Sequence, residues 1–202
     1  MTKTETPSFS YQYANKIADK VFELLQPNCD IIHKAGSLRR GKEFVKDIEI
    51  VCLPKKEFVP TDLFGGGIYQ TVPGFKSVID YIKKETVKGN TDGRYMQVIL
   101  KGDIKMDLFM PTKEDYYRQL VIRTGSADYS HKVIAARWTE LGWVGTYLGL
   151  RRRSDCYPKR DNAGKIVSWI VSNPDGEKPP VWISEKDFFE WLGVMWIEPR
   201  YR

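Results

Sequence analysis

Hydrophobic positions in the first half of the chain follow helical spacing in some segments and strand spacing in others. Residues 9–25 place apolar side chains at helical intervals, so the pattern predicts a helix that ends before Pro27. Shorter apolar runs with turn or breaker residues near them are predicted to be strands: 31–35, 46–53, 86–88, 95–100 and 105–110. A second helix is predicted at 75–84, and the glycine-rich residues 57–73 are predicted to form a loop.

The second half of the chain has longer helical patterns and more basic residues. Its predicted elements are two helices, two strand-like pieces around an irregular basic stretch, and a last helix capped by Ser184: 113–122, 127–141, 146–150, 165–171 and 184–192. The change in character near Pro111 predicts two domains, 1–111 and 112–202. Strands and helices in this order predict an α+β fold.

The composition is that of a globular protein with an excess of basic groups. Of 202 residues, 42% are hydrophobic and 29% are charged, and the formal net charge is +6, which is compatible with a polyanionic partner. No apolar run reaches the roughly 20 residues of a membrane span, so no membrane partner is expected. The three cysteines are odd in number and far apart, which favours a reduced intracellular protein, cytoplasmic or nucleoid-associated, over a disulfide-bonded one.

Three acidic residues lie on two of the predicted strands. Side chains at i and i+2 of a strand share a face, so Asp47 and Glu49 project together while Ile48 points the other way. Asp107 repeats this alternation on a later strand, and if the two strands are neighbours the three carboxylates converge. Mg²⁺ prefers oxygen ligands, and three acids can hold two such ions for displacement at phosphorus. The alternative is that Asp47 and Glu49 form the solvated face of an amphipathic strand.

A glycine-serine pair precedes these acids, in the segment Gly36-Ser37-Leu38-Arg39-Arg40-Gly41. A strand that ends in Gly-Ser before a short helix presents free backbone N–H groups to which a phosphate can bind. The Ser37 hydroxyl adds a donor, and Arg39 or Arg40 can pair with phosphate oxygens. A simple helix cap explains the pair equally well when it is taken alone. Combined with the acids, the segment predicts a site for a phosphorylated substrate.

These residues resemble the nucleotidyltransferase signature. From Ile31 to Arg202 the chain more closely resembles the DNA polymerase X family, the group that contains DNA polymerase beta. The matching segments, in chain order, are Gly36-Ser37-Leu38-Arg39-Arg40-Gly41, Asp47-Ile48-Glu49, Lys105-Met106-Asp107, Thr124-Gly125-Ser126, and Ser184-Glu185-Lys186-Asp187 with Glu198-Pro199-Arg200.

The resemblance implies a nucleotidyltransferase-type palm at 1–111 and a small thumb-like α+β domain at 112–202. The implied activity is template-directed addition of deoxynucleotides (dNTP) to a primer 3′-hydroxyl on gapped or nicked DNA, in DNA repair. It implies two Mg²⁺ ions, for which Mn²⁺ can substitute. Asp47 and Glu49 are then ligands of both ions, while Asp107 binds the catalytic ion and assists deprotonation of the primer hydroxyl. The implied nucleotide contacts are Gly36, Ser37, Arg40, Gly125 and Ser126, with a cis peptide bond between the last two.

Basic residues supply the expected DNA contacts. The helix after the Thr-Gly-Ser turn faces the template in the family. The expected contacts lie on this helix, on the third-acid strand and in a run of arginines: His131, Lys132, Arg137, Lys105, Arg151, Arg152 and Arg153. For the arginine run, a solvated loop is the alternative.

Three departures from the family bear on the activity. Glu49 stands where the family usually has Asp, as in some antibiotic nucleotidyltransferases. Ile122 and Arg123 replace the aromatic pair before Thr-Gly-Ser, which predicts weaker rejection of ribonucleotides. The family's lyase domain has no counterpart in this sequence, so no lyase activity is expected. Two alternative functions stay open: nucleotide transfer to a small molecule such as an antibiotic, and DNA binding without catalysis.

Overall fold

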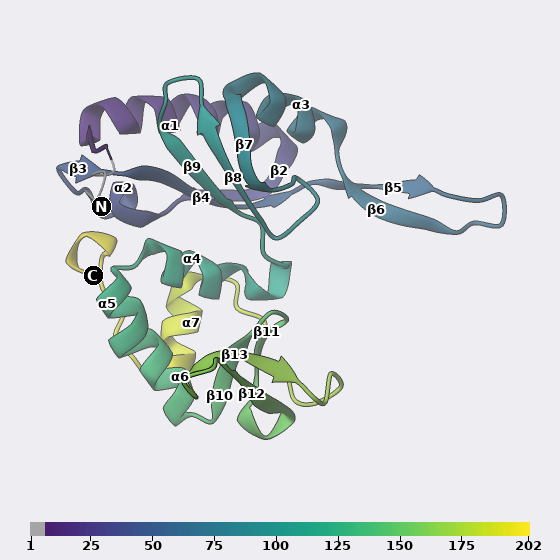
Figure 1. The fold of residues 1–202 in the computed structure, drawn as a ribbon, viewed down its shortest axis with the longest axis vertical. Helices are drawn as coiled ribbons and strands as arrows, with labels where there is room; N and C mark the ends of the chain where they lie inside the picture. The colour runs from purple at the N-terminus through teal and green to yellow at the C-terminus, as the bar shows by residue number, and fades with distance from the viewer. Residues whose placement is uncertain (1–6) are drawn as a thin grey trace.

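The computed structural model describes residues 7–202, which form the predicted α+β fold around one mixed five-stranded sheet (Figure 1). The strands of this sheet are β2 (Cys29–Lys34), β4 (Asp47–Pro54), β7 (Lys83–Gly89), β8 (Tyr95–Leu100) and β9 (Lys105–Phe109). Their order is β2-β4-β9-β8-β7; β4 and β9 pair in parallel, and the other neighbours are antiparallel. β1 (Phe9–Ser10) and β3 (Phe44–Val45) form a small separate pair.

One face of the large sheet is covered by α1 (Tyr11–Leu25) and α3 (Pro73–Ile82). α1 begins where the Ser10 side chain accepts a hydrogen bond from the Tyr13 N–H, and it ends at the short 3-10 helix η1 (Gln26–Asn28), which contains Pro27. The apolar stripes of both helices bury themselves against alternate residues of the central strands, among them Ala14, Ala18, Leu25, Phe75, Ile79, Ile48, Ile50, Met106 and Leu108. This is the largest core of the molecule.

The opposite face of the sheet is divided between apolar and acidic side chains. Its apolar half packs against α4 (Tyr116–Thr124) in a cluster of buried residues: Ala35, Val51, Leu53, Phe109, Tyr116 and Leu120. Strand alternation places Asp47, Glu49 and Asp107 on this same face, nearer the first residues of β4 and β9. α4 therefore covers one half of the face and leaves the acidic half beside it.

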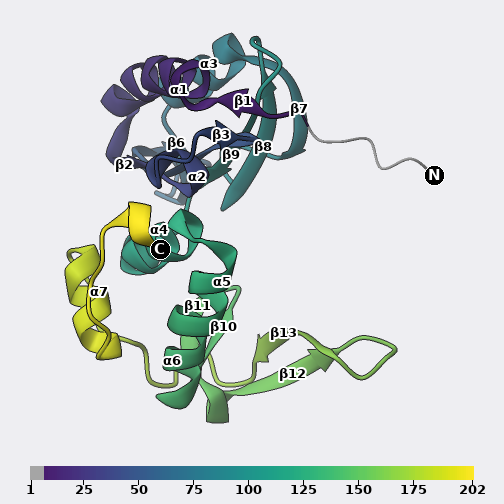
Figure 2. The same cartoon turned by 90° about the vertical axis from the view of Figure 1, so that its left-hand side faces the viewer.

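Residues 112–202 enclose a second core. Their elements are η2 (Lys113–Asp115), α4, α5 (Ala127–Tyr129), the π-helical η3 (Ser130–Ala135), α6 (Ala136–Glu140), the hairpin of β10 (Trp143–Thr146) and β11 (Gly149–Arg152), η4 (Arg153–Asp155), the hairpin of β12 (Cys156–Arg160) and β13 (Ile166–Val171), α7 (Glu185–Leu192) and η5 (Pro199–Tyr201). Aromatic side chains dominate this core: Trp138, Trp143, Trp182, Phe188 and Phe189. Figure 2 shows α4 at the boundary between the two parts. Within residues 7–202, no helix combines the length and the apolar composition needed to cross a membrane.

Predictions for the irregular segments are wrong in three places. The predicted loop 57–73 contains the hairpin of β5 (Lys56–Pro60) and β6 (Gly67–Thr71), which projects from the body in Figure 1. The predicted strand 146–150 is divided by a turn at residues 147–148, between the end of β10 and the start of β11, and the basic stretch that follows includes β12. Gly149 is consistent with this break, because its φ of +93° is a conformation that a continuous strand through 146–150 would not contain.

Candidate active site

Parallel pairing of β4 with β9 brings the predicted carboxylates together. Glu49 is the register partner of Asp107, and Asp47 is the partner of Lys105. Neighbouring strands lie about 4.8 Å apart, and paired residues point to the same face. All three acids therefore lie on one patch of the sheet. The sequence predicted this only on the condition that the two strands are neighbours, and β4 and β9 are neighbours.

Asp107 is held by two side chains of the adjacent strand β8. Its Oδ1 atom accepts hydrogen bonds from the Tyr95 hydroxyl (2.7 Å) and from the Gln97 amide (2.6 Å), and Gln97 also donates to the Tyr95 oxygen (3.0 Å). Gln97 is the register partner of Asp107. These two residues were not predicted to belong to the site. Their signal in the sequence is the alternation of 95–100, which puts Tyr95 and Gln97 opposite the buried Met96 and Val98.

Lys105, an expected DNA contact, has its ammonium group among the carboxylates. Its Nζ lies 3.1 Å from Asp47 Oδ2 and 4.0 Å from Asp107 Oδ2. These charges raise the pKa of Lys105, although burial alone would lower it. The lysine is thus a built-in counter-charge for two of the three acids.

Glu49 is partly buried beside two like charges. Burial, followed by the negative charges of Asp47 and Asp107, raises the pKa of Glu49 from 4.5 to about 7. Arg123 and Arg40 act in the opposite direction without overcoming this effect. The acids repel one another as they stand, which is the electrostatic setting that a cation relieves.

The Gly36-Ser37 turn lies directly against Glu49. Gly36 has φ +64° and begins the short helix α2 (Gly36–Arg39). A Cβ atom at this position would be 1.8 Å from Glu49 Oε2 and would displace the carboxylate, and the positive φ of residue 36 favours glycine. The predicted phosphate turn and the predicted metal strand are therefore in contact.

Two cavities meet at this point. One, of about 500 Å³, is lined by Ser37 and four cationic side chains together with two of the acids: Arg40, Lys42, Lys46, Arg123, Asp47 and Glu49. The other, of about 550 Å³, is lined by Asp107 and residues on its far side: Arg94, Tyr95, Phe109, Gln119, Thr146 and Tyr147. Glu49 and Arg123 line both. We name them the basic cavity and the acceptor cavity.

The Arg123 side chain stacks on the Phe109 ring. Its guanidinium carbon lies 4.1 Å from the centre of the Phe109 ring, a cation–π contact that directs the charge toward the acids. The sequence shows only that an arginine precedes Thr124, and the partner ring lies on the distant strand β9.

The Thr124-Gly125-Ser126 segment contacts the Gly36-Ser37 segment through Arg39 and Arg40. Arg40 donates to the Thr124 carbonyl, and a Cβ atom at Gly125 would be 2.8 Å from its Nη1 atom. The peptide bond between Gly125 and Ser126 is cis, as expected. Arg39 binds Glu185 through two hydrogen bonds (2.9 and 2.6 Å) and also donates to the Thr124 hydroxyl (2.7 Å).

The remaining expected DNA contacts differ in exposure and in the bonds that they form within the protein. His131 and Lys132 are exposed, and Lys132 pairs with Asp128 at 3.1 Å. Arg137 donates to the Leu192 carbonyl (2.7 Å) and to Glu140 (3.0 Å), so it caps the end of α7.

The three consecutive arginines point to different surroundings, because side chains alternate along β11 and Arg153 begins the 3-10 helix η4. Arg152 makes two hydrogen bonds to Glu177 (2.7 and 2.8 Å) and lies 4.3 Å from the Trp143 ring centre. Arg153 lies over the Trp169 ring, and Arg151 lines a third cavity together with Arg94 and Lys178.

The donor chemistry at the acids suits a divalent cation. Carboxylate oxygens are the ligands that Mg²⁺ prefers, and burial, followed by the charges of Asp47 and Asp107, raises the pKa of Glu49. Across residues 7–202, no three His, Cys, Asp or Glu side chains are already gathered closely enough to form a metal-binding group. Lys105 holds Asp47 and β8 holds Asp107, so the carboxylates point to separate partners.

No protein-family model matches this sequence, and a search of the curated proteins finds no match.

Proposed function

We propose that this protein is a nucleotidyltransferase of the DNA polymerase X type, which adds deoxynucleotides to the 3′-hydroxyl of a DNA primer on gapped or nicked DNA. The observation that carries the proposal is the contact between an acidic face and a basic cavity, through Glu49 and the Gly36 turn. A triphosphate needs cationic donors at its oxygens, and transfer at phosphorus needs charge compensation at the reacting centre.

The basic cavity is suited to the triphosphate. Ser37 supplies a hydroxyl donor, and Arg40, Lys42 and Lys46 supply positive charge around a volume of about 500 Å³. Gly125 lies against Arg40, so the segment that the family uses near the sugar is adjacent to the phosphate-binding arginine. The nucleotide would thus be held from two distant segments of the chain at once.

Asp107 is suited to accept the proton of the primer hydroxyl at one stated atom. Two hydrogen bonds from β8 occupy its Oδ1, which leaves Oδ2 directed toward the other acids and Lys105. Asp47, Glu49 and Asp107 would hold Mg²⁺, which, when bound, would polarise the phosphoryl oxygens and lower the pKa of the attacking hydroxyl. Tyr95 and Gln97 orient the carboxylate and keep it from rotating.

A primer-extension assay tests the proposal. Wild-type protein with Mg²⁺ and dNTPs is expected to extend the primer of a one-nucleotide gap, and Asp107→Asn is expected to lose at least about 100-fold in rate while still binding the DNA. Asp175→Asn, an exposed residue of a surface turn, is the matched control and should extend normally. Undiminished extension by Asp107→Asn would remove the catalytic assignment.

Nucleotide transfer to a small molecule is the second candidate, and the Asp47-x-Glu49 spacing favours it. The same preparation incubated with ATP and an aminoglycoside, without DNA, distinguishes the two. Transfer to the antibiotic without primer extension would favour this candidate, and a strict requirement for primer would exclude it.

A further inference from the structure

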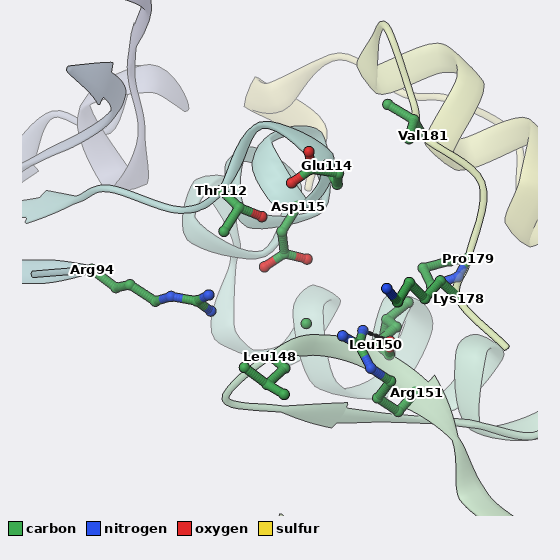
Figure 3. Close-up of a pocket in the computed structure, with 11 residues that line it drawn as sticks. Arg94, Thr112, Glu114, Asp115, Leu148, Leu150, Arg151, Lys178, Pro179 and Val181 are labelled. Atoms are coloured by element: carbon green, nitrogen blue, oxygen red, sulfur yellow. Dashed lines mark hydrogen bonds between the residues drawn. The ribbon is translucent and has the colours of Figure 1, made fainter. Parts of the chain in front are cut away.

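A third cavity, of about 270 Å³, lies beside the acceptor cavity, at the junction of the N-terminal sheet and the second core (Figure 3). Arg94 reaches it from the segment before β8, Arg151 from β11, and Lys178 from the segment before α7. Two carboxyl groups, those of Glu114 and Asp115, also line it. We name it the junction cavity.

One of these two carboxylates is already neutralised. Asp115 is buried, and its two oxygens accept bonds from Arg118 Nε (2.6 Å) and Arg118 Nη2 (2.7 Å), with Gln119 Nε2 at 3.1 Å. This bidentate pair cancels the charge of Asp115 within the wall. Glu114 is exposed, so its charge is screened by water. Three cations therefore face one solvated carboxylate.

None of the three cations forms an ion pair with a carboxylate within the described part of the chain. Arg151 pairs with no carboxylate there; its Nη1 donates to the Leu150 carbonyl (2.7 Å), and its buried Nε has no hydrogen-bond partner. Lys178 forms no ion pair with any carboxylate in residues 7–202. Arg94 stacks on Tyr147 (4.7 Å) and donates to its carbonyl. A buried donor without a partner is unfavourable, and the guanidinium that carries it lines the cavity.

The position of the cavity points to the kind of anion. Arg94 and Asp115 line both this cavity and the acceptor cavity, which holds Glu49 and Asp107. We propose that the junction cavity binds a phosphate group of the nucleic-acid strand that occupies the acceptor cavity, with Arg94, Arg151 and Lys178 as its ligands. This deepens the proposed function and rests on it for the identity of the strand. The phosphate is either an internal phosphodiester or the terminal 5′-phosphate across a gap.

Binding without turnover tests the site separately from catalysis. The probe is a one-nucleotide gapped DNA carrying a fluorophore, prepared with a 5′-phosphate or a 5′-hydroxyl on the downstream strand, in EDTA without nucleotide. Anisotropy gives the affinity at several salt concentrations for wild type, Lys178→Met and Arg151→Met. Lys20→Met, an exposed residue on α1, is the control with the same loss of charge. Lys178 is exposed, so its variant carries the test if Arg151→Met does not fold.

Each variant at the cavity is expected to weaken binding about tenfold and to reduce the slope of log affinity against log salt by about 1, while Lys20→Met changes neither. Loss of the effect on the 5′-hydroxyl probe identifies the terminal phosphate, and an equal effect on both probes identifies an internal phosphodiester. Unchanged affinity and slope in both variants would overturn the site. If the variants weaken binding but wild type never extends a primer, the site stands and the polymerase assignment fails.

Discussion

Replacing Glu49 by glutamine is expected to stabilise the protein at alkaline pH when no metal is present. Burial and the charges of Asp47 and Asp107 raise the pKa of Glu49 from 4.5 to about 7. Such a carboxyl holds its proton more tightly in the folded state. The stability of the wild type therefore falls as the pH rises from about 4.5 to about 7, and it stays reduced above that range. Glutamine keeps the shape of the side chain and removes the charge.

The size of the effect follows from the pKa. The gap between 4.5 and about 7 corresponds to roughly 3 kcal/mol, at about 1.4 kcal/mol for each pKa unit. In a chain of this length, 1 kcal/mol changes the melting temperature by about 2–4 °C. Glu49→Gln is therefore expected to melt roughly 6–12 °C above wild type at pH 8, and at the same temperature as wild type at pH 4. Differential scanning calorimetry at the two pH values measures both differences.

Glu23→Gln, at an exposed position of α1, is the matched control and should leave the melting temperature unchanged at both pH values. Mg²⁺ at pH 8 is expected to stabilise wild type more than Glu49→Gln, because the variant lacks one carboxylate ligand. Equal melting temperatures of wild type and variant at pH 8 would refute the electrostatic argument. Equal stabilisation of both by Mg²⁺ would refute Glu49 as a ligand.

Three further changes are expected to have measurable effects. Arg39 and Arg202 hold the pKa of the half-buried Glu185 below its usual range against the effect of burial, so Glu185→Gln should cost about 3 kcal/mol of unfolding free energy at pH 7. This loss should shrink as the pH falls below about 4, and Glu190→Gln on the same helix should have no effect in chemical denaturation. Tyr95→Phe removes a bond to Asp107 and should lower kcat for extension several-fold with little change in KM for dNTP, which steady-state kinetics resolves. Arg152→Ala should destabilise the fold slightly, measured by urea unfolding, and leave the salt slope of DNA binding unchanged, because this side chain is bound to Glu177.

Local pattern was sufficient to predict the framework of the fold. The helices α1 and α7 carry their start signals in Ser10 and Ser184, and strand alternation in 46–53 separates the acids from the core. The shared face of Asp47 and Glu49 follows from this alternation alone. The pairing of β4 with β9 does not follow from local pattern, because the order of strands distant in sequence depends on how the whole sheet is assembled.

The partners of individual side chains could not be predicted from the sequence either, because they also depend on contacts between distant segments. Arg39 and Arg40 look equivalent in the chain, yet Arg39 binds Glu185 and Arg40 lines the basic cavity. Arg151, Arg152 and Arg153 look like one basic patch, yet alternation along β11 and the turn that follows it send them to three different environments. A run of like residues in sequence is a patch in space only when the local backbone keeps their side chains on one side.

The contact between Glu49 and Gly36 connects the two halves of the proposed site. A carboxylate oxygen lies where a Cβ of residue 36 would be, so the backbone surface that a phosphate would approach is already in contact with an anion. Two anions at one position repel unless a cation lies between them. On the proposed function, the triphosphate can therefore use the Gly36 turn only when the Glu49 carboxylate is drawn away from it. A divalent cation held by Asp47 and Asp107 would supply that attraction, and the length of the glutamate side chain would let its carboxylate occupy either position. On the proposed function, Glu49, which stands where the family that this chain resembles usually has Asp, would couple uptake of the metal to uptake of the nucleotide.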